Sequence, residues 1–143
     1  MLYPVKFLAY CKQFSLTLTS LRKAVLYALW QTNKPLKAYD ILEVLLDEQP
    51  NATASAVYRA LGFFVDAGML HKIDSIQAYA LCNTPDVHIC SEVLMVCASC
   101  RDVRELQDVM VREAVTRLAD MDAFKLSHEP IELRGTCAVC AQK

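Results

Sequence analysis

Hydrophobic residues in the first half of the chain recur at the spacing of one helical face. The pattern runs over residues 16–32, 37–49 and 51–68, and each run predicts an amphipathic helix. Residues 1–14 carry lysines within a similar pattern and lack a small-residue cleavage site, so we expect a helix there and not a signal peptide. Residues that start or stop helices lie at or near the ends of these runs: Thr19, Ser20, Asn33, Pro35, Pro50, Asn51, Thr53 and Gly68.

Two short apolar runs follow the third of these predicted helices. Residues 69–73 and 78–82 flank the sequence Asp-Ser-Ile-Gln, and this arrangement predicts a β-hairpin. Three helices followed by a hairpin are typical of a winged helix-turn-helix domain. A small α+β core without that function is the alternative that periodicity leaves open.

The hydrophobic pattern changes in the middle of the chain. Residues 84–88, Thr-Pro-Asp-Val-His, interrupt it and are expected to connect two domains. Beyond them we predict a strand, a helix and a second strand, at about residues 93–97, 103–119 and 124–133. The prediction is therefore an α+β fold, with a winged helix-turn-helix domain at 1–82, a hinge at 83–90 and a small α/β domain at 91–143.

Composition narrows the functional class. The 143-residue chain is 55% hydrophobic and has no apolar run of the roughly 18 residues that a membrane helix needs. Residues 1–80 carry a net charge of +2 and residues 81–143 a net charge of −3, which suits an anion-binding N-terminal half but also arises on ordinary solvated surfaces. The seven cysteines of a cytoplasmic chain are expected to stay reduced, so cysteine pairs indicate metal ligands or redox groups before disulfides.

Two Cys-x-x-Cys pairs carry the strongest chemical signal. Cys97 and Cys100 form the first pair and Cys137 and Cys140 the second, with 36 residues between the pairs. Four thiolates complete the tetrahedral coordination of Zn²⁺, leave no open position and tie distant segments together. We therefore predict a structural zinc site worth roughly 10 kcal/mol or more of apparent folding free energy. An iron–sulfur cluster uses four cysteine ligands too and is the alternative that the spacing leaves open. A thioredoxin-like redox motif needs only one pair, and unligated core cysteines would not be expected in two matched pairs, so the sequence disfavours both.

Beyond these patterns, the chain resembles the ferric uptake regulator family, and within it the zinc uptake regulators. The resemblance extends from about Leu18 to Cys140, and ASAVYRALGFFVDAGMLHKI, similar to the family's recognition helix and wing, is its most specific part. PLKAYDILEVL is similar to the preceding helix, and VCASCRDVREL and GTCAVC to the metal-binding cysteine pairs, with Arg101 where glycine is usual. The resemblance implies a dimeric, metal-activated repressor whose second domain is a dimerisation domain.

The third predicted helix would then read DNA. Its apolar face turns inward, so Tyr58 and Arg59 project outward near its start, where an arginine can bind guanine in the major groove. The resemblance assigns DNA contacts to this pair and to Tyr39. Without it, Arg59 would be interpreted as an ordinary exposed arginine and Tyr58 as a half-buried tyrosine. Thr53 and Ser55 lie near a helix N-terminus and suit phosphate binding. A dimer is expected to bind double-stranded DNA with pseudo-palindromic half-sites about one helical turn apart.

A regulatory metal site is expected to join the hairpin to the second domain. With a turn centred on residues 75–76, His71 pairs with Ala80, and Cys82 then lies on the same face as His71. The resemblance adds Glu105, on the first turn of the predicted 103–119 helix, as a third ligand.

The fourth regulatory ligand is Cys90 or His88. The resemblance implies a histidine at the position that Cys90 occupies, while His88 lies two residues earlier. We choose Cys90 because its spacing matches on both sides and because a second thiolate strengthens zinc selectivity. The alternative is a three-ligand site completed by water, with both residues belonging to the linker.

These features predict a cytoplasmic, zinc-responsive, dimeric transcriptional repressor of zinc-uptake genes with two zinc ions per subunit. No Ser/His/Asp set, phosphate-binding glycine loop or HExxH motif indicates an enzyme. The alternatives are a family member that senses iron, manganese, nickel or peroxide, a zinc-stabilised adaptor and a thiol-redox protein. Cys11 is expected to be a small packed residue, and His128, which matches a metal-ligating histidine of iron-type members, a structural one.

Overall fold

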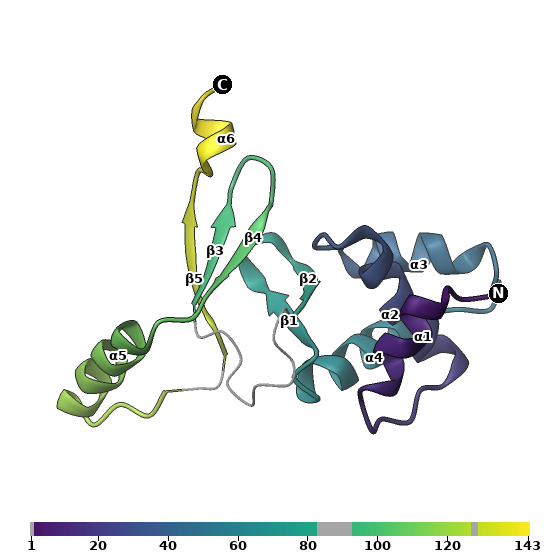
Figure 1. Cartoon of the computed structure of the whole chain (residues 1–143), viewed down its shortest axis with the longest axis horizontal. Coiled ribbons are helices and arrows are strands. Elements are labelled where there is room, and N and C mark those ends of the chain that lie inside the picture. Colours follow the sequence, from purple (N-terminus) through teal and green to yellow (C-terminus); the bar gives the residue numbers. More distant parts are fainter. Residues whose placement is uncertain (1, 83–92, 127–128) are drawn as a thin grey trace. The chain divides into compact units, whose positions relative to one another are not determined.

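The chain divides into two compact units, Met1–Leu81 and Cys82–Lys143 (Figure 1). The computed structural model describes residues 2–82, 93–126 and 129–143. The first unit contains α1 (Val5–Lys12), α2 (Ser20–Thr32), α3 (Ala38–Leu46), α4 (Ala54–Asp66), β1 (Leu70–Ile73), the 3-10 turn η1 (Asp74–Ile76) and β2 (Ala78–Leu81). The second contains β3 (Val93–Cys97), β4 (Val103–Leu106), α5 (Val109–Met121), β5 (Ile131–Gly135) and α6 (Ala138–Ala141).

The helices of the first unit begin and end at the expected kinds of residue. The hydroxyl oxygens of Thr19 and Thr53 cap α2 and α4 by accepting backbone N–H hydrogen bonds, each at 3.2 Å. Asn33 ends α2 in the left-handed conformation, with φ 50°, and Gly68 follows α4 with φ 78°. The predicted helices are confirmed, and the amphipathic N-terminal segment forms α1.

The core of the first unit forms where the four helices meet the hairpin. All of these elements contribute to its buried residues, which are Phe7, Cys11, Val25, Leu26, Ala28, Leu29, Ala38, Ile41, Leu45, Val57, Ala60, Leu61, Phe64, Met69, Leu70 and Tyr79. The ring of Phe7 lies 5.2, 5.0 and 5.4 Å from those of Tyr3, Tyr27 and Trp30, which fixes α1 against α2. Cys11 is packed in this core, as expected.

The hairpin forms the wing of a winged helix-turn-helix. β1 and β2 pair antiparallel with His71 opposite Ala80, the register that the sequence predicts. Leu36 and Tyr79 exchange two backbone hydrogen bonds, of 2.9 and 2.8 Å, which attach the segment before α3 to β2. Backbone hydrogen bonds and the packing of core side chains therefore both hold the wing against the helices.

The second unit is built on a three-stranded sheet in the order β4-β3-β5. β3 pairs antiparallel with β4 and parallel with β5. The predicted helix at 103–119 is wrong at its start, because residues 103–106 form β4 and α5 begins only at Val109. The Asp108 carboxylate sets that start by accepting the amide hydrogens of Met110 and Val111, at 2.8 and 3.4 Å.

The last predicted strand also lies later than expected. β5 begins at Ile131 and ends at Gly135, whereas the prediction began near Phe124. Parallel pairing with β3 places Gly135 opposite Cys97, so β5 ends beside the first cysteine pair. None of the described helices is long enough and apolar enough to cross a membrane.

Candidate metal centre and nucleic-acid interface

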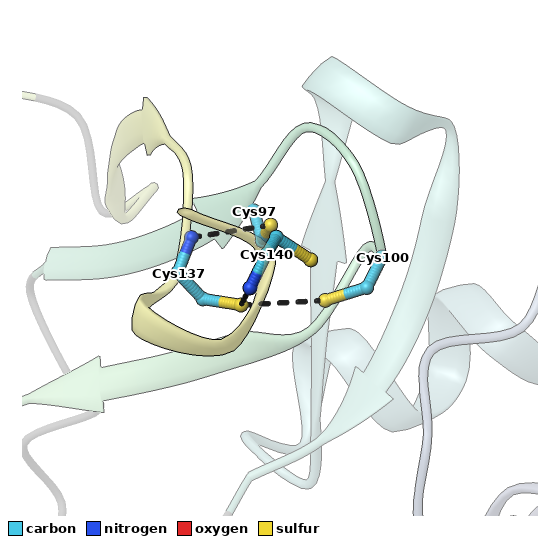
Figure 2. Close-up of side chains that lie close together, drawn as sticks. All are labelled: Cys97, Cys100, Cys137 and Cys140. Carbon is cyan, nitrogen blue, oxygen red and sulfur yellow. Dashed lines mark hydrogen bonds between the residues drawn. The ribbon is translucent and has the colours of Figure 1, made fainter. Parts of the chain in front are cut away.

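Four cysteines from two distant segments meet at one end of the sheet in the second unit (Figure 2). Cys97 is the last residue of β3 and Cys100 lies in the turn before β4, whereas Cys137 caps α6 and Cys140 lies within that helix. Their four Sγ atoms all lie within 4.8 Å of one another, and the Cys100 and Cys137 sulfurs are 3.8 Å apart. The structure thus brings together the four residues of the predicted structural site.

Backbone amides donate hydrogen bonds to the cysteine sulfurs. The Cys137 amide donates to Cys97 Sγ at 3.3 Å, and the Cys140 amide donates to Cys137 Sγ at 3.5 Å. The amides of Cys100 and Cys137 lower the pKa of Cys97 to about 6, whereas hydrogen bonding to the Cys137 thiol raises the pKa of Cys140 to about 12. The arrangement therefore favours the thiolate of Cys97, and ionisation of Cys140 as well needs a cation to offset the crowded negative charge. The Cys-x-x-Cys spacing predicted the sulfur ligands but not these backbone donors.

The sulfur arrangement fits a zinc ion. Zn–S bonds of about 2.3 Å in a tetrahedron place neighbouring sulfurs about 3.8 Å apart, which is the Cys100–Cys137 distance. Arg101 adopts the left-handed conformation, with φ 63°, and its amide donates to the Cys97 carbonyl at 2.9 Å. Arginine at a position that favours glycine therefore leaves the turn and both ligands of the first pair in place.

The structure describes three of the residues predicted for the regulatory site, each within its own unit. His71 on β1 is 3% exposed, and Cys82, directly after β2, is 4% exposed. Glu105 is half-buried on β4, so its predicted position on the first turn of a helix is wrong. Cys90 and His88, like His128, lie outside the described residues. Because His71 belongs to the first unit and the other ligands to the second, the regulatory set stays a prediction.

The predicted DNA-binding residues gather around the start of α4. Tyr39 on α3 and Tyr58 on α4 are 63% and 46% exposed, and their rings are 6.5 Å apart and nearly perpendicular. Arg59 is exposed, and its Nε donates to the Ser55 carbonyl at 3.4 Å. The Thr53 oxygen accepts the α4 cap hydrogen bond, so its hydroxyl hydrogen can still be donated to a phosphate. Aromatic, cationic and hydroxyl groups thus share one exposed surface.

Comparison with known proteins gives concordant matches. The model of the "Ferric uptake regulator family" matches residues 13–134. The "Zinc uptake regulation protein" of Escherichia coli K12 is 33% identical over 132 residues, which cover 92% of this chain and 77% of that protein. A solved structure described as "Zinc Uptake Regulator Complexed With Zinc AND DNA" matches with a TM-score of 0.83 and 32% identity, covering 96% of this chain and 91% of the other. A second, "Crystal structure of holo XcZur", matches with a TM-score of 0.81 and 30% identity over 96% and 98% of the two chains.

Proposed function

This chain belongs to the ferric uptake regulator family, and we propose that it is a zinc-responsive, dimeric repressor of genes for zinc uptake. One observation carries the proposal: the chain combines an exposed Tyr/Arg surface on a helix-turn-helix with a four-cysteine cluster suited to zinc. The similarity to zinc uptake regulators over more than nine-tenths of the chain supports zinc as the signal. We assign its action to the cytoplasm, where the cysteines stay reduced, and we assign it no catalytic role.

DNA recognition follows from the surface at α4. In this proposal α4 enters the major groove of double-stranded DNA, where the Arg59 guanidinium binds the acceptor edge of a guanine. Tyr39 and Tyr58, whose rings contact each other, lie against the backbone and the neighbouring bases. Thr53 and Ser55, at the helix N-terminus, bind a phosphate. A dimer applies this surface twice, so the operator is a pseudo-palindrome.

A second copy of the chain is supported by the exposed apolar face of α5. No residue of α5 is buried within the single chain. Met110, Leu118 and Met121 are 78%, 58% and 73% exposed, and their spacing places them along one side of the helix. Apolar area of this kind is stabilised when it is covered. Dimerisation through the second unit covers it and presents two winged domains to DNA.

Zinc is proposed at two places in each subunit. Cys97, Cys100, Cys137 and Cys140 would hold the structural ion, which when bound cross-links β3 to the C-terminal segment. His71, Cys82, Cys90 and Glu105 would hold the regulatory ion. Because these ligands come from both sides of the hinge, metal binding favours the domain arrangement that binds DNA by population shift. Imidazole and thiolate ligands in this set suit zinc better than the oxygen-preferring metals.

Substitution of Arg59 tests the DNA-binding role. Arg59→Ala is expected to weaken operator binding by roughly 1–3 kcal/mol, because a bidentate base contact is lost. The zinc content is expected to stay that of the parent, since the substitution lies in the other unit from the cysteine cluster. A titration in which variant and parent bind the operator equally would contradict this assignment.

A pair of substitutions distinguishes the two candidates for the fourth regulatory ligand. Cys90→Ser is expected to abolish zinc-dependent operator binding, and His88→Ala to preserve it. If His88→Ala removes the zinc response and Cys90→Ser leaves it intact, the ligand is His88. The structural zinc, measured by elemental analysis, serves as the internal control for folding in both variants.

A further inference from the structure

Lys72 is a cationic residue of the wing, in the same unit as the tyrosines of the proposed DNA-binding site. Lys72 lies on β1 directly opposite Tyr79 of β2, so the two side chains leave the same face of the hairpin. Burial raises the pKa of Tyr79, the Lys72 ammonium opposes that rise, and Tyr58 adds to it. Backbone hydrogen bonds of 2.9 and 2.8 Å join Tyr79 to Leu36, three residues before Tyr39, and the Tyr39 ring contacts the Tyr58 ring of α4. The strand pair that carries Lys72 is thus hydrogen-bonded directly to the helix-turn-helix that carries the tyrosines of the proposed DNA-binding site.

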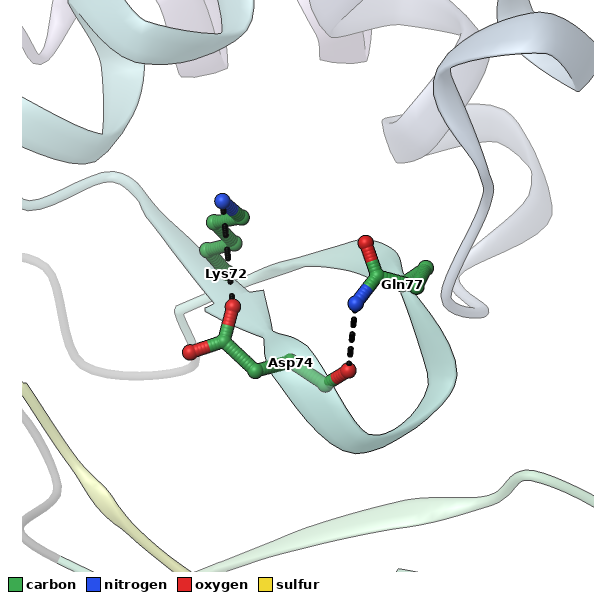
Figure 3. A network of polar contacts seen from close by, with 3 residues as sticks. All are labelled: Lys72, Asp74 and Gln77. Carbon is green, nitrogen blue, oxygen red and sulfur yellow. Dashed lines mark hydrogen bonds and ion pairs between the residues drawn. The ribbon is translucent and has the colours of Figure 1, made fainter.

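The Lys72 ammonium is paired with a carboxylate of its own wing (Figure 3). Lys72 Nζ lies 3.7 Å from Asp74 Oδ1, and the two side chains are 52% and 64% exposed. The Gln77 side-chain amide donates to the Asp74 carbonyl at 2.9 Å, and the Gln77 backbone amide donates to the same oxygen at 3.3 Å. These bonds close the tip of the wing and fix the backbone of Asp74, so the carboxylate stays within reach of Lys72.

We propose that Lys72 is a phosphate-binding residue of the wing and that Asp74 restrains it by competing for its ammonium group. The inference rests on the proposed DNA-binding function and extends it to the strength of binding. An exposed ion pair of this kind is weak, so the polyanionic duplex displaces it. Asp74 therefore lowers affinity for DNA in general without blocking access, which leaves discrimination between sequences to Arg59.

The test uses the zinc-loaded full chain and a fluorescently labelled duplex of random sequence. Phosphate contacts are the same for every sequence, so this probe reports them without knowledge of the operator. The variants are Lys72→Gln, Asp74→Asn and the double substitution, each titrated over a series of KCl concentrations. Lys12→Gln is the matched control, because it removes the same charge from an exposed lysine of α1 in the same unit. Thermal unfolding of each variant verifies that its fold is retained.

Lys72→Gln is expected to weaken binding by about three- to ten-fold and to lower the slope of log affinity against log salt by about one. Lys12→Gln is expected to leave that slope unchanged. Asp74→Asn is expected to tighten binding by about two- to five-fold in the parent background. In the Lys72→Gln background the same substitution is expected to have no effect, because its target is already absent.

Three outcomes would overturn the inference in distinguishable ways. Equal slopes for Lys72→Gln and Lys12→Gln would show that Lys72 binds no phosphate. An Asp74→Asn effect of equal size in both backgrounds would show that Asp74 repels DNA directly and does not act through Lys72. A zinc-loaded parent that binds no duplex would contradict the proposed function itself, and the inference would fall with it.

Discussion

The two units of the chain bury hydrophobic side chains to very different extents. In the first unit, all four helices and both strands of the wing supply residues to one core. In the second, the sheet contributes Val93, Leu94, Val96 and Cys97 of β3, whereas no residue of α5 is buried. The first unit thus has the packing of an independently stable domain, whereas α5 of the second unit is at most half-buried along its whole length.

This difference indicates what stabilises each unit. Because the described residues of the second unit form so small a core, we expect a metal cross-link or a partner chain to stabilise it. The second unit offers a site for each. The four-cysteine cluster at one end of its sheet can hold a metal, and the exposed apolar stripe of α5 can bind a partner chain. We infer that DNA recognition resides in the self-sufficient unit, and that metal binding and dimerisation complete the other.

The largest effect is expected from loss of one structural ligand. Cys100→Ser removes a thiolate from the cluster and should lose most of the roughly 10 kcal/mol that a structural zinc contributes. Hydrogen exchange should become fast in β3 and β5 while α2 and α4 stay protected. Cys11→Ala, a matched cysteine substitution in the other unit, should retain the zinc. Native protection of β3 in a zinc-free Cys100→Ser chain would contradict the role of the cluster.

A core truncation tests the first unit in the opposite sense. Phe64 is fully buried in α4, and Phe64→Ala should lower the free energy of unfolding of that unit by about 3–5 kcal/mol. The zinc bound at the four cysteines should not change. Denaturant unfolding with parallel elemental analysis measures both. Loss of the zinc held by the four cysteines together with the core would show that the units are not independently stabilised.

Dimerisation is tested on the exposed stripe of α5. Leu118→Glu introduces a charge where a second copy is expected to cover apolar surface, and should raise the dimer dissociation constant by about ten-fold or more. Sedimentation equilibrium measures the change. Thr116→Glu, an exposed neighbour on the same helix, is the control for added charge. Equal dissociation constants for the two variants would exclude Leu118 from the interface.

The smallest effects come from two glycines of the α4 region. A Cβ at Gly62 meets nothing within 4 Å, so Gly62→Ala should stabilise the first unit by about 0.5–1 kcal/mol through helix propensity. Gly68→Ala should destabilise it by about 1 kcal/mol, because φ there is 78°. Thermal unfolding should therefore shift in opposite directions, and shifts of the same sign would contradict the conformations of these residues.

The first unit could be predicted from sequence because its signals are local. The periodicity, the caps at Thr19 and Thr53 and the length of the turn determine its helices and the pairing of His71 with Ala80. In the second unit, Val103 and Leu106 fit the helical spacing of α5, but pairing with β3 decides their structure. Asp108, which caps α5, is a signal for the later start that the prediction did not use.

The candidate sites divide in the same way. Matched spacing was enough to predict the four-cysteine cluster, because each pair comes from one tight turn. Glu105 was matched as a ligand but assigned to the wrong element, since the boundary between β4 and α5 depends on long-range pairing. The Lys72–Asp74 pair carries no motif and became visible only from the closed wing.

The central claim, that zinc controls operator binding, is tested most directly by combining elemental analysis with DNA titration. The operator is first selected from a random duplex library with the zinc-loaded protein, and binding is then measured before mild chelation, after it and after zinc is restored. The account predicts two zinc ions per chain. Mild chelation should remove one of them and abolish operator binding, and added zinc should restore both the second ion and operator binding. Unchanged operator binding after loss of the exchangeable ion, or recovery with iron or manganese but not with zinc, would contradict it.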